Sequence, residues 1–106
     1  MNKKIIVLEI GRPIIDDVKK QIGEPVEVVS IKRAISENEI PAIVKEAYSK
    51  IRKHSDSEIH LVLSGPLGLA FTLGQAVGLS HYKIKVYQFS QGKYVEIPEL
   101  TREELF

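Results

Sequence analysis

The sequence contains no cysteine and no tryptophan. Without cysteine the chain has no disulfide, no thiolate nucleophile and no cysteine-based zinc site. It also lacks an apolar run long enough for a signal-peptide core or a membrane-spanning helix, so we expect a cytoplasmic protein. The three histidines, His54, His60 and His81, have no spacing that would direct them to one metal ion, and we expect neither a metal nor any other cofactor.

An excess of charge of one sign is also lacking. The 15 Lys and Arg nearly balance the 14 Asp and Glu, for a net charge of +1, which argues against bulk binding to DNA or to an anionic membrane. The charges are unevenly distributed, since residues 1–95 carry 14 bases and 10 acids, whereas residues 96–106 carry four acids and one base. This distribution is compatible with a small polyanionic ligand, and ordinary solvated surface charge would look the same.

What remains is the composition of one folded domain. The chain has 106 residues, of which 43% are apolar and 27% charged, which is enough for a single core and too little for two. We assign residues 1–97 to this domain and residues 98–106 to an acidic C-terminal tail.

Apolar, β-branched runs alternate with helical patterns along the chain. The expected strands are residues 4–10, 26–31, 59–63 and 83–89, and the first three are each followed by a helical pattern. This order predicts an α/β fold, a small three-layer Rossmann-like domain with a mostly parallel sheet. A turn at residues 90–92 then returns residues 93–97 as an antiparallel strand, giving a C-terminal hairpin.

Local signals predict where the helices begin. Pro13 is expected in the first turn of one helix and Pro66 in the first turn of another, because proline lacks the N–H that those positions leave unpaired. Ser36 and Glu39 have the spacing of a capping box at the start of the second helix, which is expected to end near Lys53.

The loops after parallel strands are where such sheets bind ligands. One of these loops, residues 64–68, reads Ser-Gly-Pro-Leu-Gly. Its glycines permit close approach of a ligand, and the following helix leaves backbone N–H groups free, so a phosphate or ribose could bind there. A tight strand-to-helix turn that binds no ligand would use the same residues.

Cations follow the first two strands. Arg12 lies in the first loop, and Lys32 and Arg33 lie in the second, so together with residues 64–68 they could form an anion-binding crescent. Unrelated surface cations would give the same pattern. Glu9, at the end of the first strand, could orient a ligand hydroxyl or could be a carboxylate satisfied within the protein.

The helix at residues 66–78 has no charged side chain, and none of the four charged residue types occurs between Glu58 and Lys83. A helix without a polar face is buried on all sides or packs against a partner. We expect a two-fold dimer, which could form higher assemblies, and place Leu69 in its interface. The apolar side chains of this helix are expected in the core and the interface: Leu67, Leu69, Phe71, Leu73 and Val77.

The segments IHLVLSGPLGLAFTLGQAVG, KIKVYQF and GKYVEI resemble the closing half of SAVED domains. The overlap is strongest over residues 58–97, whereas residues 1–57 are similar in element order only. SAVED and CARF domains are Rossmann-like sensors of cyclic oligonucleotides in CRISPR and related antiphage systems. Short standalone CRISPR-associated proteins of this architecture are the comparison nearest in size.

The resemblance implies a homodimer that holds cyclic tetra-adenylate across its two-fold axis. Carried over by position and combined with the loop cations, the ligand-binding residues would be Gly11, Arg12, Pro13, Lys32, Arg33, Ser64, Gly65, Pro66, Leu67, Gly68, Gln88, Phe89 and Ser90. Three functions stay open. The chain could capture the ring and damp type III CRISPR signalling, cleave it as a metal-independent ring nuclease, or serve as a protein-interaction subunit without a small ligand.

Overall fold

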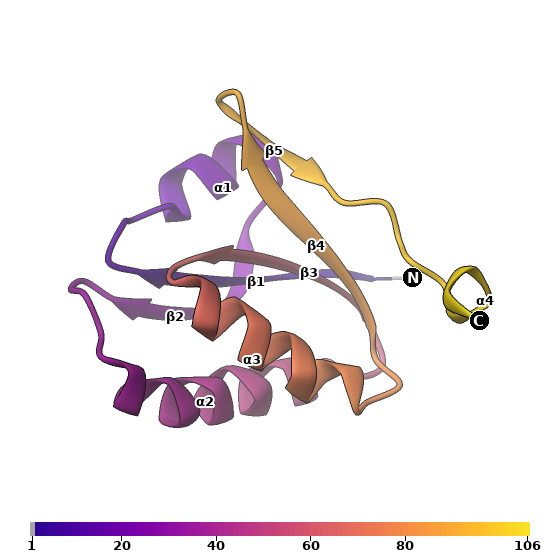
Figure 1. Ribbon diagram of the computed structural model, residues 1–106. Helices are drawn as coiled ribbons and strands as arrows, with labels where there is room; N and C mark the ends of the chain where they lie inside the picture. Colours follow the sequence, from indigo (N-terminus) through magenta and orange to yellow (C-terminus); the bar gives the residue numbers. More distant parts are fainter. Residues whose placement is uncertain (1) are drawn as a thin grey trace.

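A computed structural model of the chain describes residues 2–106 (Figure 1). A five-stranded sheet has the order β2-β1-β3-β4-β5, with every neighbouring pair parallel except β4 and β5. The predicted α/β fold with a mostly parallel sheet and a C-terminal hairpin is confirmed. In chain order the elements are β1 (Lys3–Ile10), α1 (Ile15–Gln21), β2 (Pro25–Ile31), η1 (Glu37–Glu39), α2 (Ile40–Arg52), β3 (Glu58–Ser64), α3 (Leu67–Gly78), β4 (Lys83–Ser90), β5 (Lys93–Glu96) and α4 (Arg102–Leu105).

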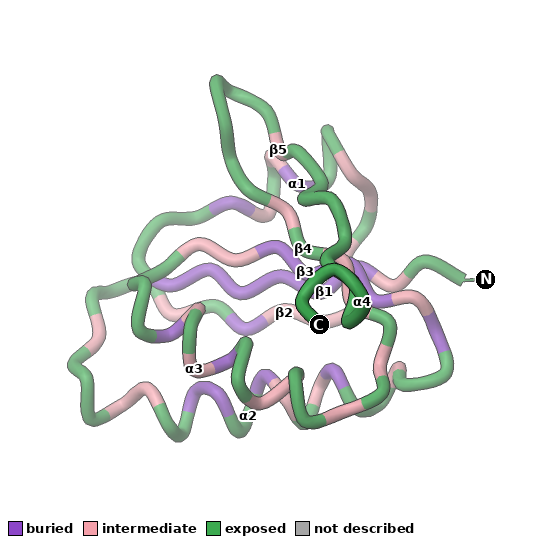
Figure 2. Tube along the Cα trace, turned by 45° about the vertical axis from the view of Figure 1, so that its right-hand side comes forward, coloured by how far each residue is buried: buried purple, intermediate pink, exposed green. Residues whose placement is uncertain are grey.

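The helices form two layers on the sheet. Helix α1 covers one face, and α2 and α3 lie side by side on the other (Figure 1). Strands β1 and β3 occupy the centre and are buried along most of their length (Figure 2). Successive side chains of β1 point to opposite faces of the sheet. Ile6 and Leu8 pack in the core beneath α2 and α3, and Ile5 and Val7 pack in the core beneath α1.

The order of the strands reverses beside β1. The chain leaves β1 through α1 to form β2 on one side, and then crosses back through α2 to form β3 on the other. The loops that follow β1 and β3 therefore turn toward opposite faces of the sheet. The edge beside such a reversal is the position in which open parallel sheets bind ligands.

Two helices begin later than predicted. Helix α1 starts at Ile15 because the N–H groups of Ile14 and Ile15 donate to the Glu9 carboxylate, which delays the helix past Pro13. Helix α3 starts at Leu67, and Pro66 precedes it in extended conformation with φ −68° and ψ 151°.

The capping box predicted from Ser36 and Glu39 is present directly before helix α2. The Ser36 N–H donates to Oε2 of Glu39 at 2.7 Å, immediately before α2.

The C-terminal hairpin leans toward α1 (Figure 1). Its two-residue turn, Gln91 and Gly92, has φ values of +52° and +81°, as tight hairpins require. The Gln21 side chain of α1 donates to the Gly92 carbonyl and accepts from the Tyr94 N–H, so its amide takes the place of a neighbouring strand along β5. Within the described part of the chain, no helix has the length and apolarity needed to span a bilayer.

Candidate functional site

Loops that are distant in sequence meet at the carboxyl edge of the sheet. The Gly11 N–H donates to the Ile31 carbonyl at 2.7 Å, which joins the loop after β1 to the end of β2. The loop after β3 is equally close, because a Cβ on Gly65 would lie 3.2 Å from Cβ of Ile10. Gly65 is therefore required by the close approach of two loops. The register places Ser64 directly beside Glu9.

Arg12 connects this edge to the end of β4. Its guanidinium carbon lies 5.2 Å from the ring centroid of Phe89, and the Phe89 ring meets that of Tyr94 edge-on at 5.2 Å. The Phe89 side is partly open, with 43% of the residue exposed. Burial, and next the charge of Asp17, raise the pKa of Tyr94, so its hydroxyl remains protonated at neutral pH. The cluster thus presents one cation and an aromatic face.

Glu9 holds the loop that carries Arg12. Its Oε1 accepts from the N–H groups of Ile14 and Ile15 at 2.7 and 3.1 Å, and its Oε2 accepts from Oγ of Ser30 at 2.6 Å. Burial raises the pKa of Glu9, but these hydrogen bonds and the charge of Lys32 outweigh it, so the pKa lies below its ordinary value. Glu9 is an ionised carboxylate whose oxygens are satisfied within the protein.

The cations after β2 differ from Arg12. Arg33 forms a two-pronged ion pair with Glu39, at 2.6 and 3.1 Å, and this pair lowers the pKa of Glu39 to about 2. Lys32 borders a hollow next to α1, where Asp16 and Asp17 offset its charge. Within residues 2–106, neither Arg12 nor Lys32 has an ion-pair partner. Arg12 is distinguished by its position over the ring of Phe89, whereas Lys32 shares its hollow with two carboxylates.

The start of α3 adds hydrogen-bond donors. No protein acceptor binds the N–H groups of Leu67 and Gly68 among the residues described, and the helix directs its positive end toward this loop. Gly68 itself has a packing role, because a Cβ there would lie 3.5 Å from Cδ1 of Ile40 in α2.

The other residues expected at the site lie around this centre. Gln88 lines a second hollow, between α3 and β4, together with Gly65 and Leu67. Ser90 is exposed at the tip of the hairpin, where it pairs with Lys93. The structure therefore brings Gly65, Leu67, Gln88 and Phe89 to one hollow and Arg12 onto Phe89, and places Lys32, Arg33 and Ser90 at the margins.

The sequence matches the SAVED family, the SMODS-associated and fused to various effectors sensor domain, over residues 2–100. The chain belongs to the SAVED family. Its fold is similar to that of the Acinetobacter baumannii Cap4 SAVED/CARF-domain containing receptor, solved with the cyclic trinucleotide 2′3′3′-cAAA, with a TM-score of 0.75 and 21% identity. The alignment covers 89% of this chain and 24% of that receptor, so the chain spans about a quarter of its length. No curated protein matches the sequence.

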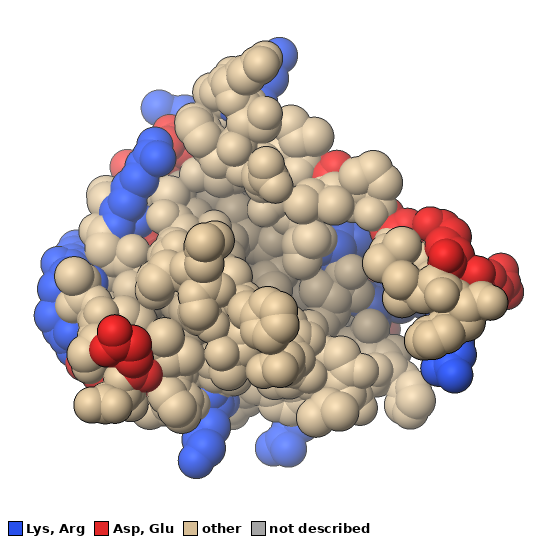
Figure 3. All heavy atoms as spheres, viewed as in Figure 1, with Lys and Arg blue, Asp and Glu red and all other residues tan. Residues whose placement is uncertain are grey.

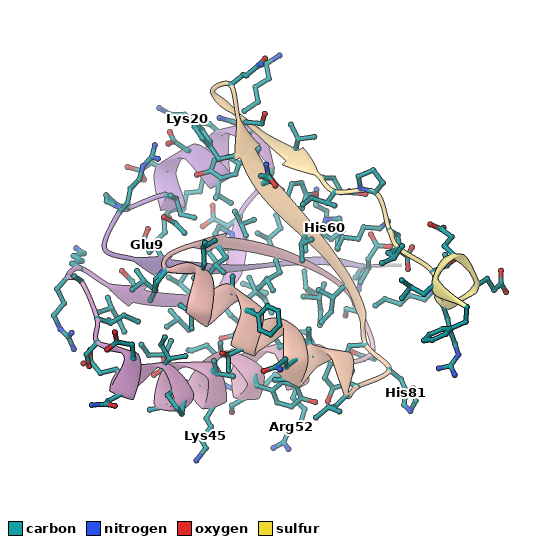
Figure 4. The ribbon with its side chains drawn as sticks, viewed as in Figure 1. Glu9, Lys20, Lys45, Arg52, His60 and His81 are labelled. Carbon is teal, nitrogen blue, oxygen red and sulfur yellow. The ribbon has the colours of Figure 1, made fainter. Side chains whose placement is uncertain are left out.

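The histidines of this SAVED domain lie away from the candidate site. His60 and His81 are toward the amino ends of β3 and β4, whereas Glu9 is near the carboxyl end of β1 (Figure 4). The His60 ring is buried between Oε1 of Glu58 and the hydroxyl of Tyr87, both at 2.7 Å. An imidazole is therefore not available to exchange protons at the carboxyl edge.

Two residues of the SAVED domain hold other elements in place: sequence named Glu9 with two alternative roles, of which the structure shows the internally satisfied carboxylate, and it gave no signal for Gln21. Glu9 and Gln21 act through tertiary contacts, with the start of α1 and with the hairpin respectively. The only sequence signal for Glu9 is an acidic residue within an otherwise apolar strand.

Proposed function

We propose that this SAVED-family chain binds a cyclic oligoadenylate at the carboxyl edge of its sheet. The observation that carries the proposal is Arg12 held over Phe89, a residue that lines one hollow with Gly65 and Leu67 at the start of α3. A guanidinium and helix N-terminal N–H groups bind phosphate, and an aromatic face stacks on a base. Each nucleotide of an oligoadenylate supplies one phosphate and one base. Membership in a family of sensor domains agrees with this ligand class.

The proposed assembly is a homodimer around cyclic tetra-adenylate. One copy offers one free Arg12 and one α3 N-terminus, whereas the ring carries four phosphates, so a two-fold pair of copies matches the ring's repeat better than a single copy does. The exposed side chains Leu67 and Phe71 lie on α3 next to the site, 88% and 72% exposed, within a broad uncharged surface (Figure 3). They replace Leu69 as the interface residues, because Leu69 is fully buried in the domain's own core.

Capture of the ring is favoured over its cleavage. Ring cleavage would have a ribose 2′-hydroxyl attack the adjacent phosphorus, forming a 2′,3′-cyclic phosphate and releasing a 5′-hydroxyl, with a proton moving from one oxygen to the other. Arg12 could stabilise the developing charge. Of the nearby carboxylates, Glu9 is satisfied internally and Glu39 is bound to Arg33, whereas Asp16 and Asp17 border the hollow beside Lys32. Capture is favoured because the groups over Phe89 and at the start of α3 bind anions, while Asp16 and Asp17 are the carboxylates that ring cleavage would have to use.

A single incubation distinguishes these functions. The full chain is mixed with radiolabelled cyclic tetra-adenylate or cyclic tri-adenylate, and bound, free and cleaved species are separated by native electrophoresis and by chromatography. Intact label in the shifted band supports capture, and the preferred ring identifies the size. Linear products would replace capture with ring cleavage. If neither ring is bound, the ligand proposal is wrong and the interaction-subunit function takes its place.

Damping of type III CRISPR signalling follows from capture by mass action. With a ring-activated nuclease as reporter, added protein should raise the ring concentration needed for half-maximal activity by an amount set by its own binding-site concentration. An enzyme would instead cause a loss of reporter activity that grows with incubation time.

A further inference from the structure

The C-terminal segment, residues 98–106, leaves the domain with its apolar side chains uncovered. Leu100, Leu105 and Phe106 are 63%, 61% and 92% exposed. The segment is nevertheless ordered as a turn, since Thr101 accepts a hydrogen bond from the Glu104 N–H at the start of α4. It also carries three acids, Glu99, Glu103 and Glu104, against one base, Arg102.

This segment does not fold back on the outer face of its own helices. The Ile97 N–H donates to the Val86 carbonyl at 2.9 Å, and the chain then passes a hollow lined by Gly78 and Lys83 as far as Leu100. Beyond that point α4 lies apart from α2 and α3 (Figure 1). Its apolar side chains therefore remain available to another molecule.

A groove runs between α2 and α3 on their outer face, and its apolar lining and positive charge complement the apolar, acidic C-terminal segment. Its lining includes Val44, Tyr48, Ala76 and the 88% exposed Leu79, together with two cations of α2, Lys45 and Arg52. No acidic side chain lines it. Lys45 and Arg52 project from the same side of α2 (Figure 4), and the acidic C-terminal segment stands out on a different part of the surface (Figure 3).

We propose that this groove binds the C-terminal segment of a second copy of the chain. Leu105 and Phe106 would pack on Tyr48 and Leu79, and the acids of the segment would pair with the cations of the groove. Apolar burial supplies affinity, and opposite charges at the margin set the orientation. Because the acids and the cations lie on two different surfaces of one sequence, the contact is heterologous, and each copy can both give and receive a segment.

This contact is separate from the proposed ligand-linked dimer. The dimer would use Leu67 and Phe71 at the start of α3, whereas the groove involves Ala76 and Leu79 at its end. The proposal therefore does not depend on cyclic oligoadenylate, and it can be tested without ligand.

Charge reversal in the full chain provides the test. Lys45→Glu/Arg52→Glu reverses the groove, and Glu103→Lys/Glu104→Lys reverses the segment. Lys19→Glu/Lys20→Glu, on the exposed surface of α1, is a control with the same change in net charge as the groove variant. Self-association is measured by sedimentation and by concentration-dependent amide chemical shifts. Each reversal should weaken association at least about tenfold, and the control should not.

Mixing the two reversed proteins decides which molecule occupies the groove. The groove variant is isotope-labelled and the segment variant is left unlabelled. On mixing, the amide signals of Tyr48 and Leu79 should again show the chemical-shift changes seen in the wild type, because a basic segment now meets an acidic groove on another copy. Concentration-independent shifts in the wild type, with no recovery on mixing, would assign the groove to the chain's own segment and overturn the proposal. Concentration-dependent shifts confined to Leu67 and Phe71, or none anywhere, would also overturn it.

Discussion

The guanidinium carbon of Arg12 lies 5.2 Å from the ring centroid of Phe89, across the end of the intervening strand β3. A cation–π contact of this exposed kind contributes about 0.5–1 kcal/mol. A two-pronged guanidinium–phosphate interaction is stronger, so a ligand phosphate can draw Arg12 away while a base takes the ring face. The contact therefore holds together the two groups that the proposed ligand site would use.

Arg12→Ala should weaken binding of cyclic tetra-adenylate by about 1–3 kcal/mol, because it removes a charge-assisted hydrogen-bond donor. Arg12→Lys retains the charge without the planar fork and should fall between the alanine variant and the wild type. Lys19→Ala, on the exposed face of α1, serves as the control. Titration calorimetry measures the affinities of the wild type and the three variants. Unchanged affinity in Arg12→Ala would remove Arg12 from the site.

Phe89→Leu should weaken binding by about 1–3 kcal/mol if the ring stacks on a base, because leucine preserves apolar packing and lacks a π face. Phe89→Tyr keeps the face and should bind nearly as well as the wild type. Folding is checked by the Tyr94 amide signal. Equal affinities for the leucine and tyrosine variants would show that the ring contributes packing alone.

Glu9→Gln tests the carboxylate that holds the β1–α1 loop. Loss of charge-assisted hydrogen bonds to Ile14, Ile15 and Ser30 should lower the free energy of unfolding by about 1–3 kcal/mol at neutral pH. The pKa of Glu9 is lower folded than the ordinary value of 4.5, so its contribution is fully present above that pH and is lost as the pH falls through the folded pKa.

The difference in unfolding free energy between wild type and Glu9→Gln should therefore shrink in acid. Urea unfolding at a series of pH values measures both proteins. Comparing the two isolates Glu9 from Glu27 and Glu58, whose hydrogen bonds to His54 and His60 also lower their pKa values. A difference that grows below pH 4.5 would contradict the assignment of Glu9 as an ionised, hydrogen-bonded group.

Gln21→Ala should release the hairpin from α1 without unfolding the sheet. The Tyr94 N–H loses its acceptor, so its hydrogen exchange should accelerate, and ligand affinity should fall because the hairpin that carries Phe89 is less fixed. Gln75→Ala, an exposed position on α3, is the matched control. If Tyr94 exchange is as slow as in the wild type, the Gln21 contact does not hold the hairpin.

Sequence alone predicted the framework, and with it the sheet edge at which the candidate site is proposed. Alternating runs predicted the parallel sheet, and a parallel sheet brings the loops after its strands to one edge. It did not predict that Arg33 binds Glu39, because the patterns assigned Arg33 to an anion-binding loop and Glu39 to a capping box, and neither pattern specifies that the two side chains meet. It also treated α3 as uniformly apolar, whereas packing against α2 buries Leu69 and leaves Phe71 outside. Pairings of this kind depend on how elements are oriented in three dimensions, which periodicity does not specify.

The exposed face of α3 supplies the last prediction. Phe71→Glu places a charge on a 72% exposed position, so the domain should fold normally while the ligand-linked dimer dissociates, because a carboxylate in a two-fold interface meets its own copy. Leu69→Glu would instead bury a charge in the core and destabilise the fold. Sedimentation with saturating cyclic tetra-adenylate measures the assembly, and the thermal midpoint reports folding. A Phe71→Glu protein that still forms the dimer would move the interface away from α3, and Gln75→Glu, at an exposed position of the same helix outside both proposed contact surfaces, shows whether any loss is specific to this face.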